Sequence, residues 1–248
     1  MNLGEPIATG NTAKIYLNDH KIFKIYKDYL PPTESAMEAA KQRFAHSCGL
    51  PVPKVIEITK VNNNQVLIME YIKGKTLGDL LFENLEMAEY YMSKSIDIQQ
   101  QIHHHEGNDL QPITAKWRRQ IEGSHILEVE TKSLILAKLK LMPNETRLCH
   151  GDYHLFNLVQ ADDKVWIIDW VDAGAGDVRA DICRSYLLYL ENHQELADLY
   201  LNIYCSKTGD TKEAILEWMP IIAGARLSEN DSPENKDKLL KIINRYIG

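Results

Sequence analysis

Cysteine is scarce in this sequence, with four residues among 248, and the four are scattered without paired spacing. This pattern predicts neither a disulfide framework nor a zinc site, and reduced thiols in a cytoplasmic protein are the simpler interpretation. The sequence also lacks an apolar run long enough to span a membrane, and residues 1–14 lack the apolar core of a signal peptide. We therefore expect a cytoplasmic protein with no membrane partner.

Basic residues are in deficit, because 28 lysines and arginines face 35 aspartates and glutamates, which gives a net charge of −7. General nucleic-acid binding needs a basic face, so we expect no nucleic-acid partner. A cationic small molecule would suit the acidic chain, although most acidic proteins are simply soluble. The hydrophobic fraction of 44% and the charged fraction of 25% are ordinary for a globular protein. The length allows one large domain or two lobes.

Residues 147–181 contain short apolar runs that end in polar residues, which predicts strands that carry polar side chains to one rim. Asp152 is followed five positions later by Asn157, and Asp169 ends the next apolar run. Phosphoryl transfer needs a carboxylate that orients the attacking hydroxyl and takes its proton, and oxygen ligands for Mg²⁺. The protein-kinase catalytic loop has the same Asp-x-x-x-x-Asn spacing, with a metal-binding aspartate downstream.

The segments HGDYHLFNLV, IIDW and GDVRAD resemble the aminoglycoside phosphotransferase and choline kinase family, which writes the catalytic loop as His-Gly-Asp. The resemblance implies that Asp152 is the catalytic base and that Asn157 and Asp169 are ligands of Mg²⁺, with ATP or GTP as co-substrate. It also implies that Asp181 anchors the catalytic loop by hydrogen bonds. A polar turn with solvated carboxylates is the alternative, and it explains the ordered set of motifs less well.

The N-terminal residues 2–30 predict strands around a turn at Gly10. The resemblance makes this turn the loop that covers the phosphates, although Gly10 is its only glycine and a plain hairpin turn is the more frequent explanation. Lys24 lies inside an apolar strand, where a lysine either extends to solvent or holds an anion. The resemblance assigns Lys24 to the α- and β-phosphates, and we expect Lys21 and Lys27 to be solvated.

A helix should follow the two prolines at 31–32, with Thr33 as its cap, and run to about His46. In the family, a glutamate on this helix pairs with the strand lysine. Counting back eleven residues from the Gly-Leu-Pro-Val-Pro stretch gives Glu38, with Glu34 as the alternate. An ordinary solvated helix charge is the other interpretation of Glu38.

Residues 54–59 and 65–72 read as an antiparallel strand pair that ends in a linker. In a kinase-like fold this linker joins the two lobes, and its backbone recognises adenine. By resemblance, Met69 lines the back of the nucleotide pocket, and the Glu70 carbonyl and the Ile72 amide contact the base.

The remainder of the chain is predicted to be helical, including a long helix over 86–105 and a last helix over 239–247. The histidines at 103–105 are adjacent on a helix and cannot all face one ion, so we interpret them as structural. The acidic residues 229–231 could line a site for an amine, but a solvated loop is the simpler interpretation.

Together these patterns predict an α+β, two-lobed protein-kinase-like fold, with a small antiparallel-sheet lobe over 1–73 and a larger, mostly helical lobe over 74–248. The expected activity is transfer of the γ-phosphoryl group of ATP or GTP to a hydroxyl of a small molecule, as in aminoglycoside phosphotransferases. The alternatives are a choline or other amino-alcohol, sugar or homoserine-type kinase, and a nucleotide-binding relative without turnover. The acceptor and the oligomeric state stay open at this point.

Overall fold

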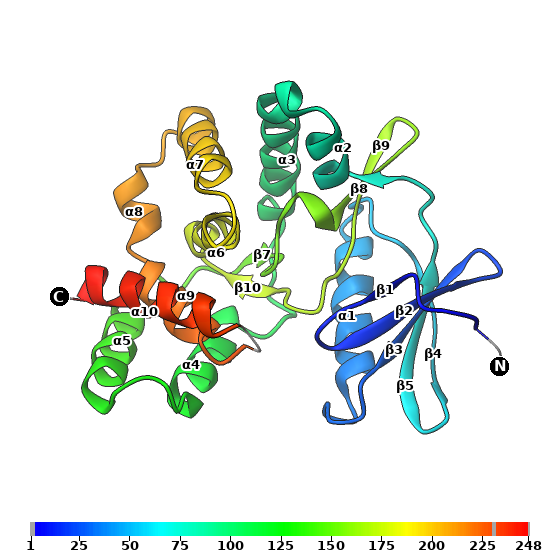
Figure 1. Cartoon of the computed structure of the whole chain (residues 1–248), viewed down its shortest axis with the longest axis horizontal. Helices are drawn as coiled ribbons and strands as arrows, with labels where there is room; N and C mark the ends of the chain where they lie inside the picture. Colours follow the sequence, from blue (N-terminus) through cyan, green and yellow to red (C-terminus); the bar gives the residue numbers. More distant parts are fainter. Residues whose placement is uncertain (1–2, 230–231, 248) are drawn as a thin grey trace. The chain divides into compact units, whose positions relative to one another are not determined.

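The computed structural model describes residues 3–229 and 232–247. The chain divides into two compact units, shown in Figure 1. The first holds the described residues within Met1–Leu80 and Phe156–Asp172, and the second those within Leu81–Leu155 and Ala173–Gly248. A small antiparallel sheet and a helical remainder confirm the predicted α+β class. Residues 156–172, which the sequence assigned to the larger lobe, pack with the first unit.

The first unit is built on a five-stranded sheet of order β1-β2-β3-β5-β4, with every neighbouring pair antiparallel. Two of its hairpins turn on two residues with positive φ, Asp19 and His20 in one and Asn62 and Asn63 in the other. Short polar side chains such as Asp and Asn tolerate this left-handed backbone, which matches the twist of the flanking strands. The strands are β1 (Ala8–Thr9), β2 (Ala13–Asn18), β3 (Lys21–Tyr26), β4 (Val55–Val61) and β5 (Asn64–Glu70).

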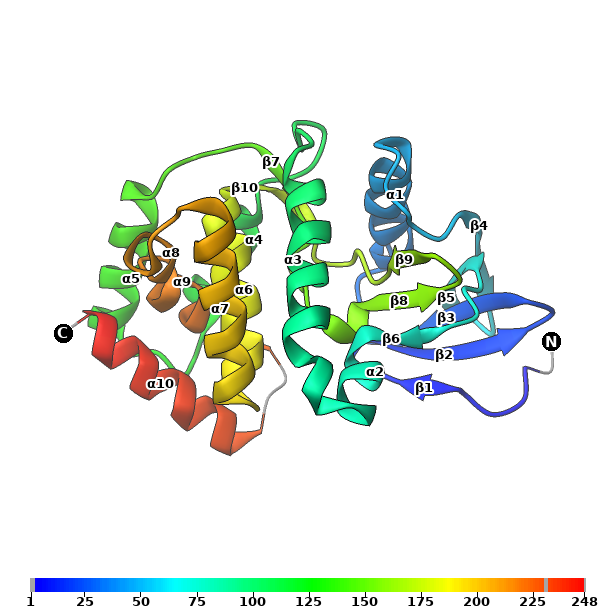
Figure 2. The same ribbon diagram turned by 90° about the horizontal axis from the view of Figure 1, so that it is seen from above.

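Helix α1 (Glu34–Ser47) packs on one face of this sheet, as Figure 2 shows. Ala39 of the helix joins Tyr26 and Leu67 of the sheet in one buried apolar cluster. The expected cap at Thr33 is wrong in one respect, because its side chain forms no capping hydrogen bond. Thr33 has a helical backbone, with φ −103° and ψ −2°, and an effective cap needs an extended one. Its hydroxyl contacts Met37 Sδ at 3.7 Å instead.

A smaller sheet of order β6-β8-β9 completes the first unit. Its strands are β6 (Lys75–Thr76), β8 (Leu158–Ala161) and β9 (Lys164–Ile167), and the short helix η2 (Leu155–Asn157) precedes β8. Thr76 and Asp79 cap helix α2 (Leu77–Glu83) reciprocally: the Asp79 amide donates to Thr76 Oγ1, and the Thr76 amide donates to Asp79 Oδ2. The β8–β9 hairpin brings the ends of η2 and β9 together, which positions two of the predicted site residues.

The second unit is mostly helical, and α3, α6 and α7 lie side by side in it (Figure 2). No helix within the described ranges is both long and apolar enough to cross a membrane. Its elements are η1 (Leu85–Met87), α3 (Ala88–His103), α4 (Ile113–Gly123), α5 (Val129–Leu141), β7 (Arg147–Cys149), β10 (Gly174–Gly176), α6 (Val178–Leu190), α7 (Gln194–Thr208), α8 (Lys212–Leu216), α9 (Met219–Arg226) and α10 (Pro233–Ile247).

The last helix begins earlier than the sequence pattern predicted, at Pro233 instead of Leu239. Proline suits the first helical position because its missing N–H would have no partner there, and the Ser232 hydroxyl accepts a hydrogen bond from the Asn235 amide at 3.3 Å. The polar run that read as a loop is therefore the solvent-facing first turn of an amphipathic helix, and only Leu239 and Ile243 of α10 are buried.

Candidate active site

Lys24 of β3 is the centre of a charged cluster inside the first unit. Its Nζ donates to Glu38 Oε1 and to Asp169 Oδ1, both at 2.8 Å. The other Glu38 oxygen accepts a hydrogen bond from the Tyr26 hydroxyl at 2.6 Å. Lys24 and Tyr26 point to the same face because alternate residues of a strand do so, and α1 lies over that face. The contact between Lys24 and Glu38 was predicted from the sequence. The role of these two residues toward a nucleotide stays a prediction.

Two members of the cluster are almost closed to solvent, since Lys24 is 6% and Glu38 is 1% exposed. Burial lowers the pKa of Lys24, but the carboxylates of Asp169 and Glu38 outweigh burial and raise it above its ordinary value. The ammonium group therefore stays charged at any physiological pH. A buried, permanent cation held by two carboxylates is suited to neutralising phosphate oxygens that come into its reach.

Asp169 lies two residues after the end of β9 and has a left-handed backbone, with φ 63°. This conformation is uncommon for a residue with a side chain, and such strain concentrates at functional sites. The Asp169 side chain is 39% exposed although Lys24 holds it. The Asp169 carboxylate is thus partly exposed to solvent, while the lysine ammonium that holds it is buried.

Asn157, the other predicted metal ligand, lies next to the Asp169 segment. Its carbonyl accepts a hydrogen bond from the Ile168 amide at 3.0 Å, and Leu158 is paired with Ile167 across the β8–β9 hairpin. Carboxylate and amide oxygens are hard donors of the kind that Mg²⁺ prefers. The donor set at this hairpin therefore fits Mg²⁺.

Lys41 makes a contact that the sequence analysis did not predict. It lies on α1, three residues after Glu38, so the two side chains share one face of the helix. Its Nζ donates to the carbonyl of Val171 at 2.6 Å. Helix α1 therefore holds the segment after β9 at two points: indirectly at Asp169, through Lys24, and directly at Val171. The i, i+3 spacing from Glu38 was the only signal in the sequence.

The other residues predicted to contact a nucleotide also lie in the first unit. Gly10 is exposed in the β1–β2 turn, and its amide donates to Ala13 O at 2.9 Å. Met69 is buried in β5, and Glu70 ends that strand with Oε2 accepting from the Lys54 amide at 3.2 Å. Ile72 follows, half-buried. Their contacts with adenine or phosphate stay predictions.

Asp152, the predicted base, belongs to the second unit and lies in the loop after β7. Its carboxylate lies 3.6 Å from His154 Nε2 and 3.7 Å from Arg184 Nη2. The preceding Gly151 has φ +80°, a left-handed value that only glycine adopts readily, which explains the glycine of the His-Gly-Asp motif. The Asp152 amide donates to His150 Nδ1 at 3.3 Å.

The Asp152 carboxyl is shifted strongly toward its ionised form. Burial raises its pKa, but the hydrogen bond from His154 and the positive charge of Arg184 outweigh burial and hold the pKa well below its usual range. The group is therefore a carboxylate at neutral pH, which a base that accepts a hydroxyl proton must be.

Asp181 of α6 anchors this loop from a fully buried position. Its Oδ1 accepts from the Gly151 amide at 2.8 Å, and its Oδ2 lies 2.8 Å from His103 Nε2 and 3.4 Å from the His150 amide. These bonds confirm the expected anchoring role and the structural role of His103. Cys149 offers a third ligand atom within 4.8 Å of the other two, but the Asp181 oxygens are already engaged by the loop and by His103. We therefore interpret the trio as structural.

The known-protein comparisons agree with this geometry. The sequence profile of the phosphotransferase enzyme family matches residues 4–218, which is most of the chain. The chain belongs to the phosphotransferase enzyme family. No curated protein matches its sequence.

Solved structures of phosphotransferases share the fold of this family member. A thermostable mutant of aminoglycoside phosphotransferase APH(4)-Ia, in ternary complex with ADP and hygromycin B, has a TM-score of 0.69 at 14% identity, covering 98% of this chain and 91% of that one. A choline/ethanolamine kinase family protein from Mesorhizobium loti has a TM-score of 0.63 at 15% identity, with coverages of 98% and 86%. An aminoglycoside-3'-phosphotransferase of type VIII has a TM-score of 0.62 at 16% identity, with 90% of each chain covered. These matches confirm the predicted kinase-like fold.

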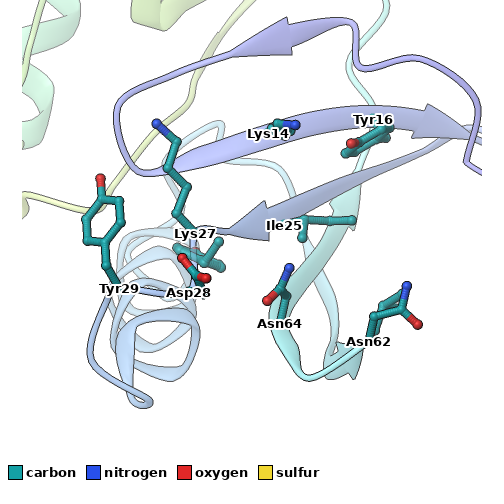
Figure 3. A pocket seen from close by; sticks show the side chains of 10 residues that line it. Lys14, Tyr16, Ile25, Lys27, Asp28, Tyr29, Asn62 and Asn64 are labelled. Carbon is teal, nitrogen blue, oxygen red and sulfur yellow. The ribbon is translucent and has the colours of Figure 1, made fainter.

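A cavity of about 410 Å³ borders the five-stranded sheet of this phosphotransferase family member (Figure 3). Two of its lining residues, Lys14 of β2 and Ile25 of β3, are paired and point to the face opposite Lys24, which pairs with Ile15. The residues that line the cavity are Lys14, Tyr16, Ile25, Tyr26, Lys27, Asp28, Tyr29, Val61, Asn62 and Asn64. None of them is among the residues predicted to bind the nucleotide.

The acidic segment 229–231 is the clearest error of the sequence analysis. Glu229 is not a solvated loop charge, because it forms ion pairs with Arg184 at 3.1 Å and with Arg226. Asn230 and Asp231 lie outside the described residues. Arg184 lies 45 residues before Glu229, so no local pattern marked it as a partner, whereas Arg226 lies only three residues before Glu229.

Proposed function

We propose that this protein transfers the γ-phosphoryl group of ATP or GTP to a hydroxyl group of a small molecule. The observation that carries the proposal is the contact of the buried Lys24 with both Glu38 and Asp169. A permanent cation beside a carboxylate at the end of a strand is suited to a metal-bound nucleotide, and membership in the phosphotransferase enzyme family supports the same activity.

In this proposal the first unit binds the nucleotide. Lys24, held by Glu38, neutralises charge on the α- and β-phosphates, and the Gly10 turn covers them. Asn157 and Asp169 would hold Mg²⁺, which when bound neutralises charge on the phosphate oxygens. The segment from Met69 to Ile72 provides backbone groups for the base. Such transfer depends mainly on positioning and on charge neutralisation, and most of these groups are fixed before substrate arrives.

Asp152 acts on the acceptor. Its carboxylate orients the acceptor hydroxyl and takes its proton as the hydroxyl oxygen forms a bond with the γ-phosphorus. The bond from that phosphorus to the bridging oxygen breaks, and the nucleoside diphosphate leaves with the electron pair. The anchoring of the loop by Asp181 keeps Asp152 in place without a role in the bond changes.

The acceptor class is the finer part of the proposal. One structural relative was solved with hygromycin B and another is named for choline and ethanolamine, so hydroxyl compounds that carry amines come first among the acceptors to test. Aminoglycosides lead this group, with choline and other amino alcohols, sugars and homoserine as alternatives. A relative that binds nucleotide without turnover is disfavoured, because Lys24, Asp152, Asn157 and Asp169 are all present.

A phosphorylation screen across aminoglycosides, macrolides, choline, homoserine and sugars tests the activity. With an acceptor in hand, Asp152→Asn should lower turnover by about 100- to 10,000-fold, because the base is lost. Nucleotide affinity measured by calorimetry should change little. Asp109→Asn, the same replacement at an exposed position of the second unit, serves as the matched control. Full turnover in Asp152→Asn would contradict the assigned role.

A further inference from the structure

Tyr26 of β3 is a buried tyrosine whose hydroxyl has no part in the reaction described above. It is 1% exposed. The hydroxyl donates to Glu38 Oε2 at 2.6 Å, while the other oxygen of Glu38 accepts from Lys24 at 2.8 Å. The ring of Tyr26 lies 5.8 Å from Lys24 Nζ, which is within the range of a cation–π contact. One tyrosine side chain therefore contacts both members of the Lys24–Glu38 pair.

The two oxygens of Glu38 are bound to different partners, and this division has a consequence for the lysine. A carboxylate is able to place both of its oxygens on one cationic partner. In Glu38, Oε2 is held by the Tyr26 hydroxyl and Oε1 by the ammonium of Lys24. Lys24 also donates to Asp169 at 2.8 Å, so two carboxylates share one ammonium. A Glu38 that turned both oxygens toward Lys24 would compete with Asp169 for it.

The hydrogen bond from Tyr26 also supports the charge of Glu38. Burial raises the pKa of Glu38, and the hydrogen bond from Tyr26 opposes this rise because it favours the carboxylate. Burial and the charge of Glu38 in turn raise the pKa of Tyr26, so the hydroxyl keeps its proton and stays a donor. Without the hydroxyl, a buried carboxylate oxygen would lose its partner, which is costly in a protein interior.

We propose that Tyr26 is a positioning residue for the nucleotide site, and that its hydroxyl holds Glu38 so that Lys24 stays directed at the phosphates and at the carboxylate that would bind Mg²⁺. The inference rests on the proposed function, because the role of Lys24 toward a nucleotide belongs to that proposal. Strand geometry places Tyr26 for this role, since it lies two residues after Lys24 and points to the same face of β3.

Tyr26→Phe isolates the hydroxyl, because phenylalanine fills nearly the same volume and keeps a ring beside Lys24. Affinity for ADP with Mg²⁺, measured by calorimetry, should fall by about tenfold, which is near the lower value of a hydrogen bond to a charged group. Affinity for adenosine should stay the same, because adenosine has no phosphate for Lys24 to hold. GDP and guanosine replace this pair of probes if the protein prefers guanine.

Tyr16→Phe is the matched control. It makes the same change in the first unit, but Tyr16 of β2 pairs with Phe23 and so points to the face of the sheet opposite Lys24. Both affinities should equal those of the wild type in this variant. Equal losses for ADP and adenosine in Tyr26→Phe, or a lower melting temperature with both affinities unchanged, would make Tyr26 merely structural and overturn the inference.

A double variant tests whether Tyr26 acts through Glu38. Once Glu38 is glutamine, the hydroxyl no longer orients a carboxylate, so adding Tyr26→Phe to Glu38→Gln should cost little further affinity for ADP. Additive losses of affinity in the double variant would overturn the path through Glu38. If Tyr26→Phe does not fold, Glu38→Gln alone carries the test, because it removes the carboxylate that the hydroxyl orients. Unchanged affinity for ADP in that variant would then count against the inference.

The decisive experiment observes Lys24 without any nucleotide, by NMR of protein labelled with ¹⁵N-lysine. The Lys24 ammonium should give a signal protected from exchange with water, because it is 6% exposed and donates to two carboxylates. Tyr26→Phe should move this signal and Tyr16→Phe should not, and an unmoved signal in Tyr26→Phe would overturn the inference. If the signal moves but the wild type phosphorylates no acceptor and binds no nucleotide, the proposed function fails while the hold of Tyr26 on Lys24 stands.

Discussion

Lys24 and Asp169 are separated by 145 residues in the sequence, yet the lysine Nζ donates to the aspartate Oδ1 at 2.8 Å. The same ammonium is held by Glu38 of α1. The lysine thus fixes the position of the carboxylate proposed to bind Mg²⁺. The arrangement couples three elements of the first unit, β3, α1 and the segment after β9, through one buried charge.

Lys24→Met should reduce both stability and nucleotide affinity. Removing the ammonium leaves Glu38, which is 1% exposed, without its cationic partner. Breaking a buried pair from one side typically costs about 3–5 kcal/mol. Urea unfolding measures the stability loss and calorimetry the affinity. Lys21→Met, three residues earlier on the same strand, is the control, and equal losses in the two variants would refute a special role for Lys24.

Asp169→Asn should remove the Mg²⁺-dependent part of nucleotide binding. The amide keeps the size of the side chain but loses the charge that attracts the metal, so affinity for the magnesium–nucleotide complex should fall by about tenfold or more. Binding of the nucleotide with EDTA present should change much less. Titrations with and without Mg²⁺ measure the difference, with Asp163→Asn in the exposed β8–β9 turn as control. The same affinity for the magnesium complex in wild type and variant would argue against metal ligation.

The residues that could be predicted are those that short sequence motifs mark. The Asp152–Asn157 spacing lies within one loop, and the pairing of Lys24 with Glu38 followed from a motif with fixed offsets. Asp181 could be assigned because the segment GDVRAD resembles the family motif whose aspartate anchors the catalytic loop. In each case a short motif marks the residue, so a resemblance in the sequence transfers to the structure.

Contacts set by packing of distant segments could not be predicted. Lys41 reaches the Val171 carbonyl only because α1 lies along the segment after β9. Arg184 and Glu229 meet because the end of α9 packs beside α6. Glu229 lies in a polar stretch and was interpreted as solvated, because its partner Arg184 lies 45 residues away. The start of α10 was missed for a simpler reason, since Ser232 and Pro233 form a helix start that resembles a turn in sequence.

Asp181→Asn should destabilise the protein most near neutral pH. Burial raises the pKa of Asp181, but the hydrogen bonds and charge from His103 and the Gly151 amide bond outweigh burial and lower it. Because the pKa is lower in the folded state, the carboxylate stabilises the fold above the unfolded-state value of about 3.9 and loses this effect as pH falls through the folded-state value. Melting curves of wild type and variant should therefore converge as pH is lowered below about 4. A difference in stability that is the same at pH 7 and pH 3 would contradict this linkage.

Gly74→Ala should destabilise the first unit although Gly74 is exposed and forms no part of the charged cluster. A Cβ at this position would overlap the carbonyl oxygen of Gln160 and lie 2.8 Å from its carbonyl carbon. Both are backbone atoms of β8, and the next residue, Lys75, is paired with Gln160, so the added methyl must push β6 away from β8. Forced overpacking of this kind costs about 1–3 kcal/mol. Gly123→Ala is the control, because a Cβ there meets nothing within 4 Å at the end of α4, and it should be neutral or stabilising by up to about 1 kcal/mol. Urea unfolding of the two alanine variants decides the point: equal stabilities would mean that β6 can shift without cost and that its pairing with β8 does not hold the segment that leads out of β5.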